Sequence, residues 1–408
     1  MARVLCVWEL GAELGHISKL RLPIEVALAE GHQVFLAARE LRRVKLILGD
    51  MPITYFQAPL KHRDLTPEPI HQSFGQMLAH QCFAGVDETE MLLRAWGSLF
   101  DLVQPDLVLF EHSPLALTAA YGRPFKKVPV GSGFMLPPLP ARPTDPFAPF
   151  ITVRRTPEVM QALSEHDARL LQTINQAIAR TGRPLLPALA DIYAQVDHYF
   201  LMTWPQLDHF GAREGLYYLG TEPPRPQAAP EWPAGDGPRV FGYLHPIPML
   251  ERLLQDLRSA NLRVLLVVRD LPEHIRQAYT CYQLHFADGL VDLAQVAREA
   301  DWVINHANHN TVATFMLAGL PQLTIPLQQE QLFAVLRLVA QGVALLAYQD
   351  QAGFAGEVHT LNTSAAMREK ARALAAECAA VGSPDAGAFI RGAMQVLLPP
   401  AAPGSAAA

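Results

Sequence analysis

Short apolar runs alternate with amphipathic stretches along most of the chain. Residues 4–8 form a continuous apolar run that is typical of a buried strand, and a glycine-containing turn follows it. Apolar residues then recur at three- and four-residue spacing between Ile17 and Leu28, which predicts a helix. Further strands are predicted at residues 34–37 and 107–110.

The alternation is more regular in the second half of the chain. A last amphipathic helix is predicted there, with Thr363 or Ser364 as its N-cap. Alternation of strand and helix implies right-handed βαβ units and a mostly parallel sheet. Six strands are predicted in this half, at residues 240–244, 263–268, 282–286, 302–305, 323–325 and 344–346.

The length of 408 residues fits two domains better than one hydrophobic core. Proline and glycine cluster within residues 220–238, which we interpret as the linker between a domain at 1–219 and a domain at 239–398. The tail 399–408 contains only Pro, Ala, Gly and Ser and is expected to be disordered. The predicted fold class is α/β, with two Rossmann-like, doubly wound parallel-sheet domains facing each other across a ligand-binding cleft.

Composition excludes several classes of protein. Half of the residues are apolar and 18% are charged, a balance typical of globular proteins. The net charge is −6 and no basic block is present, which argues against a nucleic-acid partner. The four cysteines are scattered and predict reduced thiols in a cytoplasmic protein. No apolar run is long enough to predict a membrane-spanning segment or a signal peptide.

The segment 301–331 carries the most informative chemistry. A buried strand is predicted to end at Asn305, and a helix is predicted to begin near Asn310 or Thr311, which are favoured capping types. A helix N-terminus at the mouth of a parallel sheet offers N–H groups and positive potential to a diphosphate, and His306 could donate a further hydrogen bond. The alternative is that Asn310 and Thr311 only cap the helix and that the bonds of His306 are satisfied inside the protein.

This segment resembles the donor signature of the UDP-glycosyltransferase-like family, which includes the macrolide glycosyltransferases and has the GT-B fold. The resemblance implies that His306 contacts the diphosphate and that Asn310 and Thr311 lie at the phosphates. It also implies that Glu330 and Gln331 bind the hydroxyls of the donor sugar. Eight residues agree in order and spacing over 26 positions, namely His306, Asn310, Thr311, Gly319, Pro321, Pro326, Glu330 and Gln331.

Two positions depart from this signature. Asn308 stands in place of a small glycine, and although Asn tolerates left-handed backbone, it adds bulk near the phosphates. Thr314 replaces a Glu that commonly holds the ribose hydroxyls, so that either a UDP sugar or a dTDP sugar could be the donor. The base is expected to contact backbone groups of the loop 288–293, around Val291. His245, at the end of the first strand of the second domain, is a further candidate for phosphate binding.

Gly15 and His16 lie between the first predicted strand and the first predicted helix. This turn lacks the Gly-x-Gly-x-x-Gly pattern of a dinucleotide site, so an NAD enzyme is poorly supported. Together with Gly31 and His32, the turn resembles the opening of the same glycosyltransferase family. The resemblance implies that His16 is the general base for the acceptor hydroxyl, a task that suits a group with a pKa of about 6.5.

A carboxylate is expected to orient this base. The resemblance places an acidic residue at the end of a later strand of the first domain, a position that Glu111 occupies. Glu13 is a second carboxylate near His16 and could take the same part. The other interpretation of Glu111 is a solvated charge at the end of a strand.

No metal and no separate cofactor are predicted. The chain has no Asp-x-Asp motif, which argues against a metal-bridged diphosphate and for a leaving group stabilised by the helix dipole and His306. His306 and His309 are spaced like a pair of ligands, but no partner motif accompanies them.

The sequence thus predicts an inverting, metal-independent glycosyltransferase that moves a hexose from a nucleotide diphosphate sugar to a hydroxyl of an apolar small molecule. Residues 67–96 and the proline-rich loop 137–149 are expected to line the acceptor pocket. Two alternatives stay open. One is a catalytically degenerate relative that binds a nucleotide or sugar as a partner protein, and the other is a sugar-nucleotide epimerase of the same fold.

Overall fold

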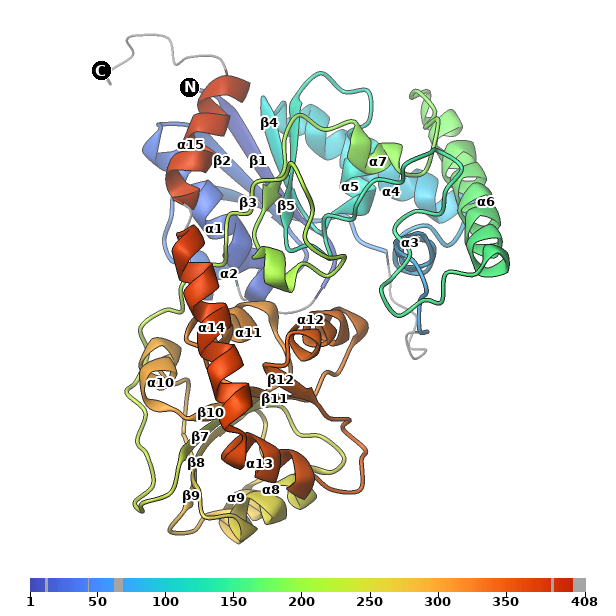
Figure 1. Cartoon of the computed structure of the whole chain (residues 1–408). Coiled ribbons are helices and arrows are strands. Elements are labelled where there is room, and N and C mark those ends of the chain that lie inside the picture. The colour runs from blue at the N-terminus through green and yellow to red at the C-terminus, as the bar shows by residue number, and fades with distance from the viewer. Residues whose placement is uncertain (12–13, 43, 62–68, 383–384, 399–408) are drawn as a thin grey trace, which may run out of the picture. The chain divides into compact units, whose positions relative to one another are not determined.

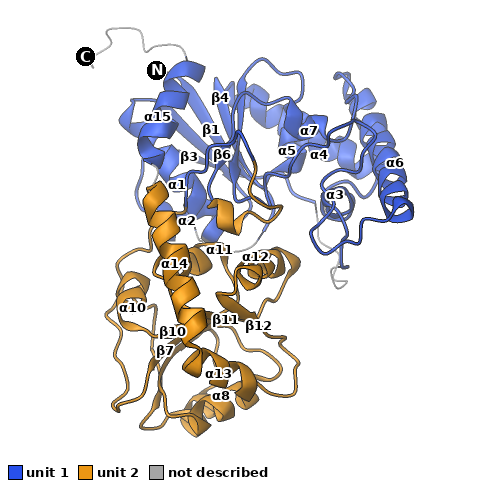
Figure 2. Ribbon diagram, viewed as in Figure 1, with its two compact units in different colours: residues 1–203, 214–220, 385–408 blue, residues 204–213, 221–384 orange. Residues whose placement is uncertain are grey.

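The computed structural model describes residues 1–11, 14–42, 44–61, 69–382 and 385–398. The chain divides into two compact units, which Figure 2 shows in different colours. Unit 1 comprises Met1–Thr203, Glu214–Gly220 and the segment from Asp385, and unit 2 comprises Trp204–Arg213 and Thr221–Pro384.

Unit 1 is built on a six-stranded parallel sheet with helices on both faces (Figure 1). The strand order is β3-β2-β1-β4-β5-β6, which is the order of a Rossmann fold. The strands are β1 (Arg3–Trp8), β2 (Gln33–Ala38), β3 (Ile53–Gln57), β4 (Leu107–Glu111), β5 (Lys126–Gly131) and β6 (Phe200–Leu201). The helices are α1 (Leu14–Ala29), α2 (Val44–Leu48), α3 (Phe74–Gln81), α4 (Val86–Val103), α5 (Pro114–Ala119), α6 (Pro157–Thr181), α7 (Asp191–Ala194) and α15 (Ala386–Leu397).

Unit 2 has a second six-stranded parallel sheet, in the order β12-β11-β10-β7-β8-β9. Read from the opposite edge, this is the same order as in unit 1. The strands are β7 (Arg239–Leu244), β8 (Arg263–Val268), β9 (Leu284–Phe286), β10 (Trp302–Asn305), β11 (Gln322–Thr324) and β12 (Ala344–Leu346). The helical segments are the 3-10 turn η1 (Pro205–Leu207), α8 (Leu250–Ser259), α9 (Glu273–Tyr279), α10 (Leu293–Glu299), α11 (His309–Leu317), α12 (Gln329–Ala340), α13 (Ala355–Thr363) and α14 (Ala365–Val381).

The central strands of both sheets are apolar along their length because helices cover both of their faces. Residues 4–8 of β1 are at most 1% exposed, and every residue of β10 is buried. The predicted alternation of strands and helices is therefore confirmed. All nine strands predicted from apolar runs are present, and their ends lie within two residues of the predicted ones.

Three strands were not predicted, and neither was the helix that follows α14. Pro129 and two lysines interrupt the apolar character of β5, β3 is a partly exposed edge strand, and β6 has only two residues. The helix α14 begins as predicted, with the Ser364 hydroxyl accepting a hydrogen bond from the N–H of Met367 at 3.2 Å. The helix α15 follows it and was missed.

The division into units differs from the predicted domain boundaries in two places. Trp204–Arg213 belongs to unit 2, although it precedes the predicted linker. The helix α15 belongs to unit 1, where Ile390 and Met394 are fully buried in the core that α1 also covers. An amphipathic pattern predicts that one face of a helix is buried, but it does not indicate which core the helix covers.

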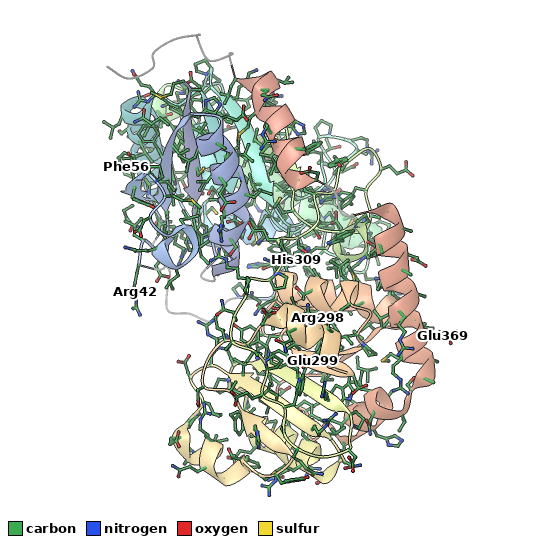
Figure 3. The ribbon with its side chains drawn as sticks, turned by 90° about the vertical axis from the view of Figure 1, so that its left-hand side faces the viewer. Arg42, Phe56, Arg298, Glu299, His309 and Glu369 are labelled. Carbon is green, nitrogen blue, oxygen red and sulfur yellow. The ribbon has the colours of Figure 1, made fainter. Side chains whose placement is uncertain are left out.

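The predicted linker, residues 220–238, contains no helix or strand, but part of it is anchored to unit 2. The carbonyl of Ala228 accepts a hydrogen bond from the N–H of Asp292 at 2.8 Å. The indole N–H of Trp232 donates to Glu299, labelled in Figure 3, at 2.6 Å. The predicted tail 399–408 lies outside the described residues. Among the described helices, none combines the length and the apolar character needed to cross a membrane.

Candidate active site

The candidate residues of each unit gather where the strand order of its sheet reverses. In unit 1 the strands that follow β1 are added on one side of the sheet, and those that follow β4 are added on the other side. In unit 2 the same holds for β7 and β10. In sheets of this kind, ligands bind beyond the carboxyl ends of such a central pair of strands. Glu111 ends β4 and His16 follows β1, while His245 and His306 directly follow β7 and β10.

In unit 1 the structure brings His16 and Glu111 together. Nδ1 of His16, in the first turn of α1, lies 2.9 and 3.0 Å from the two carboxylate oxygens of Glu111. Glu111 is fully buried and His16 is 7% exposed, so Glu111 is not a solvated charge. Because a carboxylate only accepts, this contact places the ring proton on Nδ1 and leaves Nε2 as a proton acceptor. Glu13, the alternative partner, lies outside the described residues.

A buried lysine balances the charge of this pair. Nζ of Lys19, one turn after His16 on α1, lies 3.7 Å from Oε1 of Glu111 and donates a hydrogen bond to the carbonyl of Gly15 at 3.3 Å. Lys19 is 5% exposed. Buried charges are rare unless they are paired, so the group is best described as His16, Glu111 and Lys19 acting together.

The surroundings of His16 hold its ring in place on several sides. The rings of Trp8 and His112 stack nearly parallel to it, with centroids 5.9 and 5.7 Å away. Gly11 has a φ of +81°, and a Cβ at this residue would lie 1.8 Å from Nε2. Only glycine therefore fits at residue 11, because any side chain there would collide with the imidazole of His16.

In unit 2 the helix α11 begins earlier than predicted. Asn308 holds the N-cap position, without a side-chain capping bond, whereas Asn310 and Thr311 lie within the first turn and cap nothing. The left-handed residue of the turn is Ala307, with a φ of +61°, and not Asn308, whose φ is −57°. The side-chain oxygen of the buried Asn305 accepts a hydrogen bond from the N–H of Ala307 at 2.8 Å and so holds the turn.

His306 is bonded inside the protein through both of its ring nitrogens. Nδ1 lies 2.6 Å from the carbonyl of Ile325, and Nε2 accepts a hydrogen bond from the N–H of His245 at 2.8 Å. Burial is the main cause that lowers the pKa of His306 below 6.5, which favours the neutral ring. A neutral ring has one N–H, and here it faces Ile325. This arrangement favours the alternative that the bonds of His306 are satisfied inside the protein, and its contact with a diphosphate stays a prediction.

His245 is partly exposed, and its ring stacks with that of His306 at a centroid distance of 6.0 Å. Its backbone joins the ends of β7 and β10 through the bond to His306. The backbone of His245 therefore holds the imidazole of His306 in place. The ring of His245 is more exposed to solvent than the ring of His306.

The starts of α11 and α12 are tied together through one side chain. The buried Gln331 accepts a hydrogen bond from the N–H of Leu327 at 2.7 Å and donates one to the side-chain oxygen of Asn308 at 2.9 Å. The bulk of Asn308 is thus turned toward Gln331. Asn308, which departs from the donor signature, is thus engaged by Gln331, which matches it.

The remaining donor candidates lie around these two helix starts. Asn310 is partly exposed and Thr311 is buried, both in the first turn of α11, where backbone N–H groups have no acceptor within the helix. Glu330 lies partly exposed in the first turn of α12. The hydroxyl of Thr314 donates to the carbonyl of Asn310 at 2.8 Å, so its proton is used within the helix.

The loop before α10 is fixed to unit 2 by the side chains of Val291 and Asp292. The side chain of Val291 is 6% exposed and packs into the apolar core around Val303 and Phe315, so that any contact of this residue with a base would involve its backbone. Asp292 caps α10 by accepting a hydrogen bond from the N–H of Gln295 at 2.9 Å.

Several residues of these half-sites were not found from the sequence. Lys19 carried one signal, its position three residues after His16 on the same helix, but a lone lysine on a helix usually faces solvent. Asn305 was interpreted only as the end of a strand. Among the described residues, no group of three His, Cys, Asp or Glu side chains could hold a metal ion. His309, labelled in Figure 3, is the first residue of α11, and its ring stacks on that of His209 with centroids 5.4 Å apart.

No family model and no curated protein matches this sequence. Solved structures match it over nearly its whole length. The glycosyltransferase of kitacinnamycin has a TM-score of 0.71 at 15% identity, with 98% of this chain and 99% of that chain covered. Glycosyltransferase VinC in complex with dTDP has a TM-score of 0.63 at 14% identity, covering 97% and 99%. SsfS6 of Streptomyces sp. SF2575, complexed with thymidine diphosphate, has a TM-score of 0.62 at 17% identity, covering 97% and 100%.

The chain has the GT-B fold. At identities of 14–17%, these structural matches establish the fold alone. The matched fold agrees with the two sheets of identical strand order described above. The GT-B fold predicted from the motifs is thereby confirmed. In this GT-B chain, each Rossmann-like unit carries its candidate residues at its own point of strand-order reversal.

Proposed function

We propose that this chain is an inverting glycosyltransferase that moves a hexose from a dTDP or UDP sugar to a hydroxyl of an apolar small molecule, without a metal ion. The observation that carries the proposal is the buried pair of His16 and Glu111 at the carboxyl edge of unit 1, which leaves Nε2 of His16 as a proton acceptor. A protein that only binds a sugar or nucleotide has no use for a base held in this way.

In the proposed reaction, Nε2 of His16 takes the proton of the acceptor hydroxyl. The acceptor oxygen forms a bond to the anomeric carbon from the face opposite the leaving group, which inverts its configuration. The bond between the anomeric carbon and the phosphate oxygen breaks, and its electron pair leaves with the nucleoside diphosphate. Glu111 stabilises the imidazolium that forms, through the hydrogen bond from Nδ1.

The donor is proposed to bind at the starts of α11 and α12 in unit 2. Their first N–H groups and their positive ends suit a diphosphate and stabilise the charge of the leaving group, so that the proposal needs no metal ion. Glu330 and the second amide N–H of Gln331 are proposed for the sugar hydroxyls. Two similar structures, VinC and SsfS6, are complexes with thymidine diphosphate, which supports a dTDP sugar here. Thr314, in place of a ribose-binding Glu, points the same way.

An apolar acceptor is supported by the rings around His16. His112, which stacks on His16, meets Phe134 edge-on with centroids 6.3 Å apart, and Phe134 stacks on Phe150 at 5.8 Å. Phe150, like Phe74 and Trp96 of the predicted acceptor segment 67–96, is fully buried, whereas His112 and Phe134 are each 7% exposed. The proposal of an apolar acceptor therefore rests on the aromatic rings next to the base.

A panel of nucleotides and nucleotide sugars tests the donor half of the proposal. The pure protein in excess EDTA should be stabilised against thermal unfolding by dTDP, UDP and their sugars in a saturable way, since each binds the folded state. GDP and AMP serve as controls and should have a much smaller effect. A protein that responds to none of these compounds would contradict the proposal. Saturable binding without any turnover would instead favour the catalytically degenerate relative.

A further inference from the structure

One fully buried carboxylate of unit 1 has no part in the proposed reaction. Glu9 follows β1 directly and is 0% exposed. Its carboxylate accepts hydrogen bonds from the backbone N–H groups of Leu115 and Ala116 at 3.0 and 3.3 Å and from the indole N–H of Trp96 at 3.2 Å. Since neighbouring residues of a strand point to opposite faces of the sheet, Glu9 lies on the face of α4 and α5, away from Trp8.

Burying the carboxylate of Glu9 costs free energy, because the charge loses its contact with water. Desolvation raises the pKa of Glu9 to about 8, although the N–H groups of Ala116, Trp96 and Leu115 and the charge of Arg39 oppose the shift. Two further groups, Cys82 and Tyr193, have a pKa raised first by burial and in part by the charge of Glu9. Burying a carboxylate among such groups lowers the stability of the fold. A residue of this kind is therefore expected to have a structural or functional role.

Within the described part of the chain, the backbone N–H groups that donate to this carboxylate belong to the segment that follows Glu111. Glu111 ends β4, His112 and Ser113 form the turn, and α5 begins at Pro114. His112 has a φ of +41°, a left-handed conformation that is strained for a residue with a side chain. Such a conformation persists only when its surroundings hold it.

The segment from Trp8 to Leu10 holds this turn on both sides. On one side, the N–H of Leu10 donates to the carbonyl of His112 at 3.0 Å. On the other side, Glu9 binds the first N–H groups of α5. Trp8 lies beside Glu111 in the register of the sheet and stacks on His16. Three consecutive residues thus contact the base, its carboxylate partner and the turn that follows.

We propose that Glu9 is a positioning residue, whose carboxylate fixes the turn between β4 and α5 and through it the orientation of Glu111 toward His16. The expected effect on turnover rests on the proposed function, whereas the expected effect on the contact between Glu111 and His16 does not.

The test exploits the donors around Glu9. Above about pH 8, where Glu9 of the parent is ionised, its carboxylate accepts from all three donors. In Glu9→Gln the amide oxygen can still accept from α5, but the amide N–H groups then face the indole N–H of Trp96, donor against donor. The turnover number should fall about tenfold, with the donor KM unchanged, as expected for one displaced hydrogen bond. Adding Trp96→Phe removes the opposing N–H and should restore most of the loss. Glu25→Gln, the same change at a partly exposed residue of α1 paired with Arg21, should leave turnover unchanged.

A second measurement needs no activity. In protein with ¹⁵N-labelled histidines, the Nδ1–H signal of His16, identified by its loss in His16→Ala, reports the bond to Glu111. This signal should shift or broaden in Glu9→Gln, return in Glu9→Gln with Trp96→Phe, and stay in place in Glu25→Gln. If the parent transfers no sugar but the signal responds in this way, the proposed function fails and the positioning role stands. If Glu9→Gln folds and leaves both the signal and turnover unchanged, the positioning role is wrong.

Discussion

Replacing Glu111 with Gln tests the geometry of the base most severely. The substitution keeps the shape of the side chain and removes its charge. The amide can donate an N–H to Nδ1 of His16, which moves the ring proton to Nε2 and so removes the acceptor that the reaction needs. It also leaves the buried ammonium of Lys19, now 3.7 Å from a neutral group, to disfavour an imidazolium nearby.

The contacts set the size of the effect. The carboxylate lies 2.9 and 3.0 Å from Nδ1, and hydrogen bonds to a charged group are worth roughly 1.5–3 kcal/mol. Since about 1.4 kcal/mol corresponds to a factor of ten in rate, the lost bond alone gives about 10–100-fold. The wrong tautomer adds to this, so that the total should be on the order of 10²–10⁴-fold.

Release of the nucleoside diphosphate at saturating acceptor measures this effect. The turnover number of Glu111→Gln should fall by the stated factor, while the affinity for dTDP or UDP stays within about twofold of the parent, because Glu111 lies in unit 1 and the proposed donor site in unit 2. Glu25→Gln is the matched control. A turnover number within about threefold of the parent would refute the reasoning, since a loss that small needs no wrong tautomer.

Three further predictions concern the two half-sites. Thr314→Glu should shift nucleotide preference toward UDP in calorimetric titrations, because a carboxylate rewards the 2′-hydroxyl; a parent that already binds UDP more than about tenfold tighter than dTDP (~1.4 kcal/mol) would contradict this. Excess EDTA should leave the transfer rate largely intact, and a complete loss that Mg²⁺ or Mn²⁺ restores would show that the diphosphate needs a metal. The ring of His306 should titrate below its ordinary pKa of 6.5 in NMR spectra, since protonation sets Nε2 against the N–H of His245; a midpoint at or above 6.5 would speak against the assigned bonds.

Apolar periodicity was sufficient to predict most of the fold. Buried parallel strands such as β1 and β8 are continuous apolar runs, because both faces are covered, and such runs can be seen without a structure. The strand β5 was missed because Pro129 and its lysines resemble a loop. The placement of α15 in unit 1 depends on which core a helix meets late in the chain, and no local pattern encodes that.

The candidate site was predictable where it matched a motif and not where it depends on long-range pairing. His16 and Glu111 were paired by resemblance, and the structure places them in contact. The partners of His306 are backbone groups of Ile325 and His245, and no motif indicates these pairings. Glu9 and Lys19 were overlooked because a charged residue usually faces solvent, and only the folded contacts indicate that these two are buried.

Transfer itself is the most direct test of the central claim that His16 is the base of a sugar transfer. The protein is incubated in EDTA with a dTDP or UDP hexose and a panel of apolar compounds that carry a hydroxyl group, and the glycosides are detected by mass spectrometry. The account predicts a glycoside of inverted anomeric configuration from the parent protein. It also predicts about 10²–10⁴-fold less product from His16→Ala, with nucleotide binding retained. His16→Ala protein that transfers sugar at the parent rate, or a product with retained configuration, would contradict it.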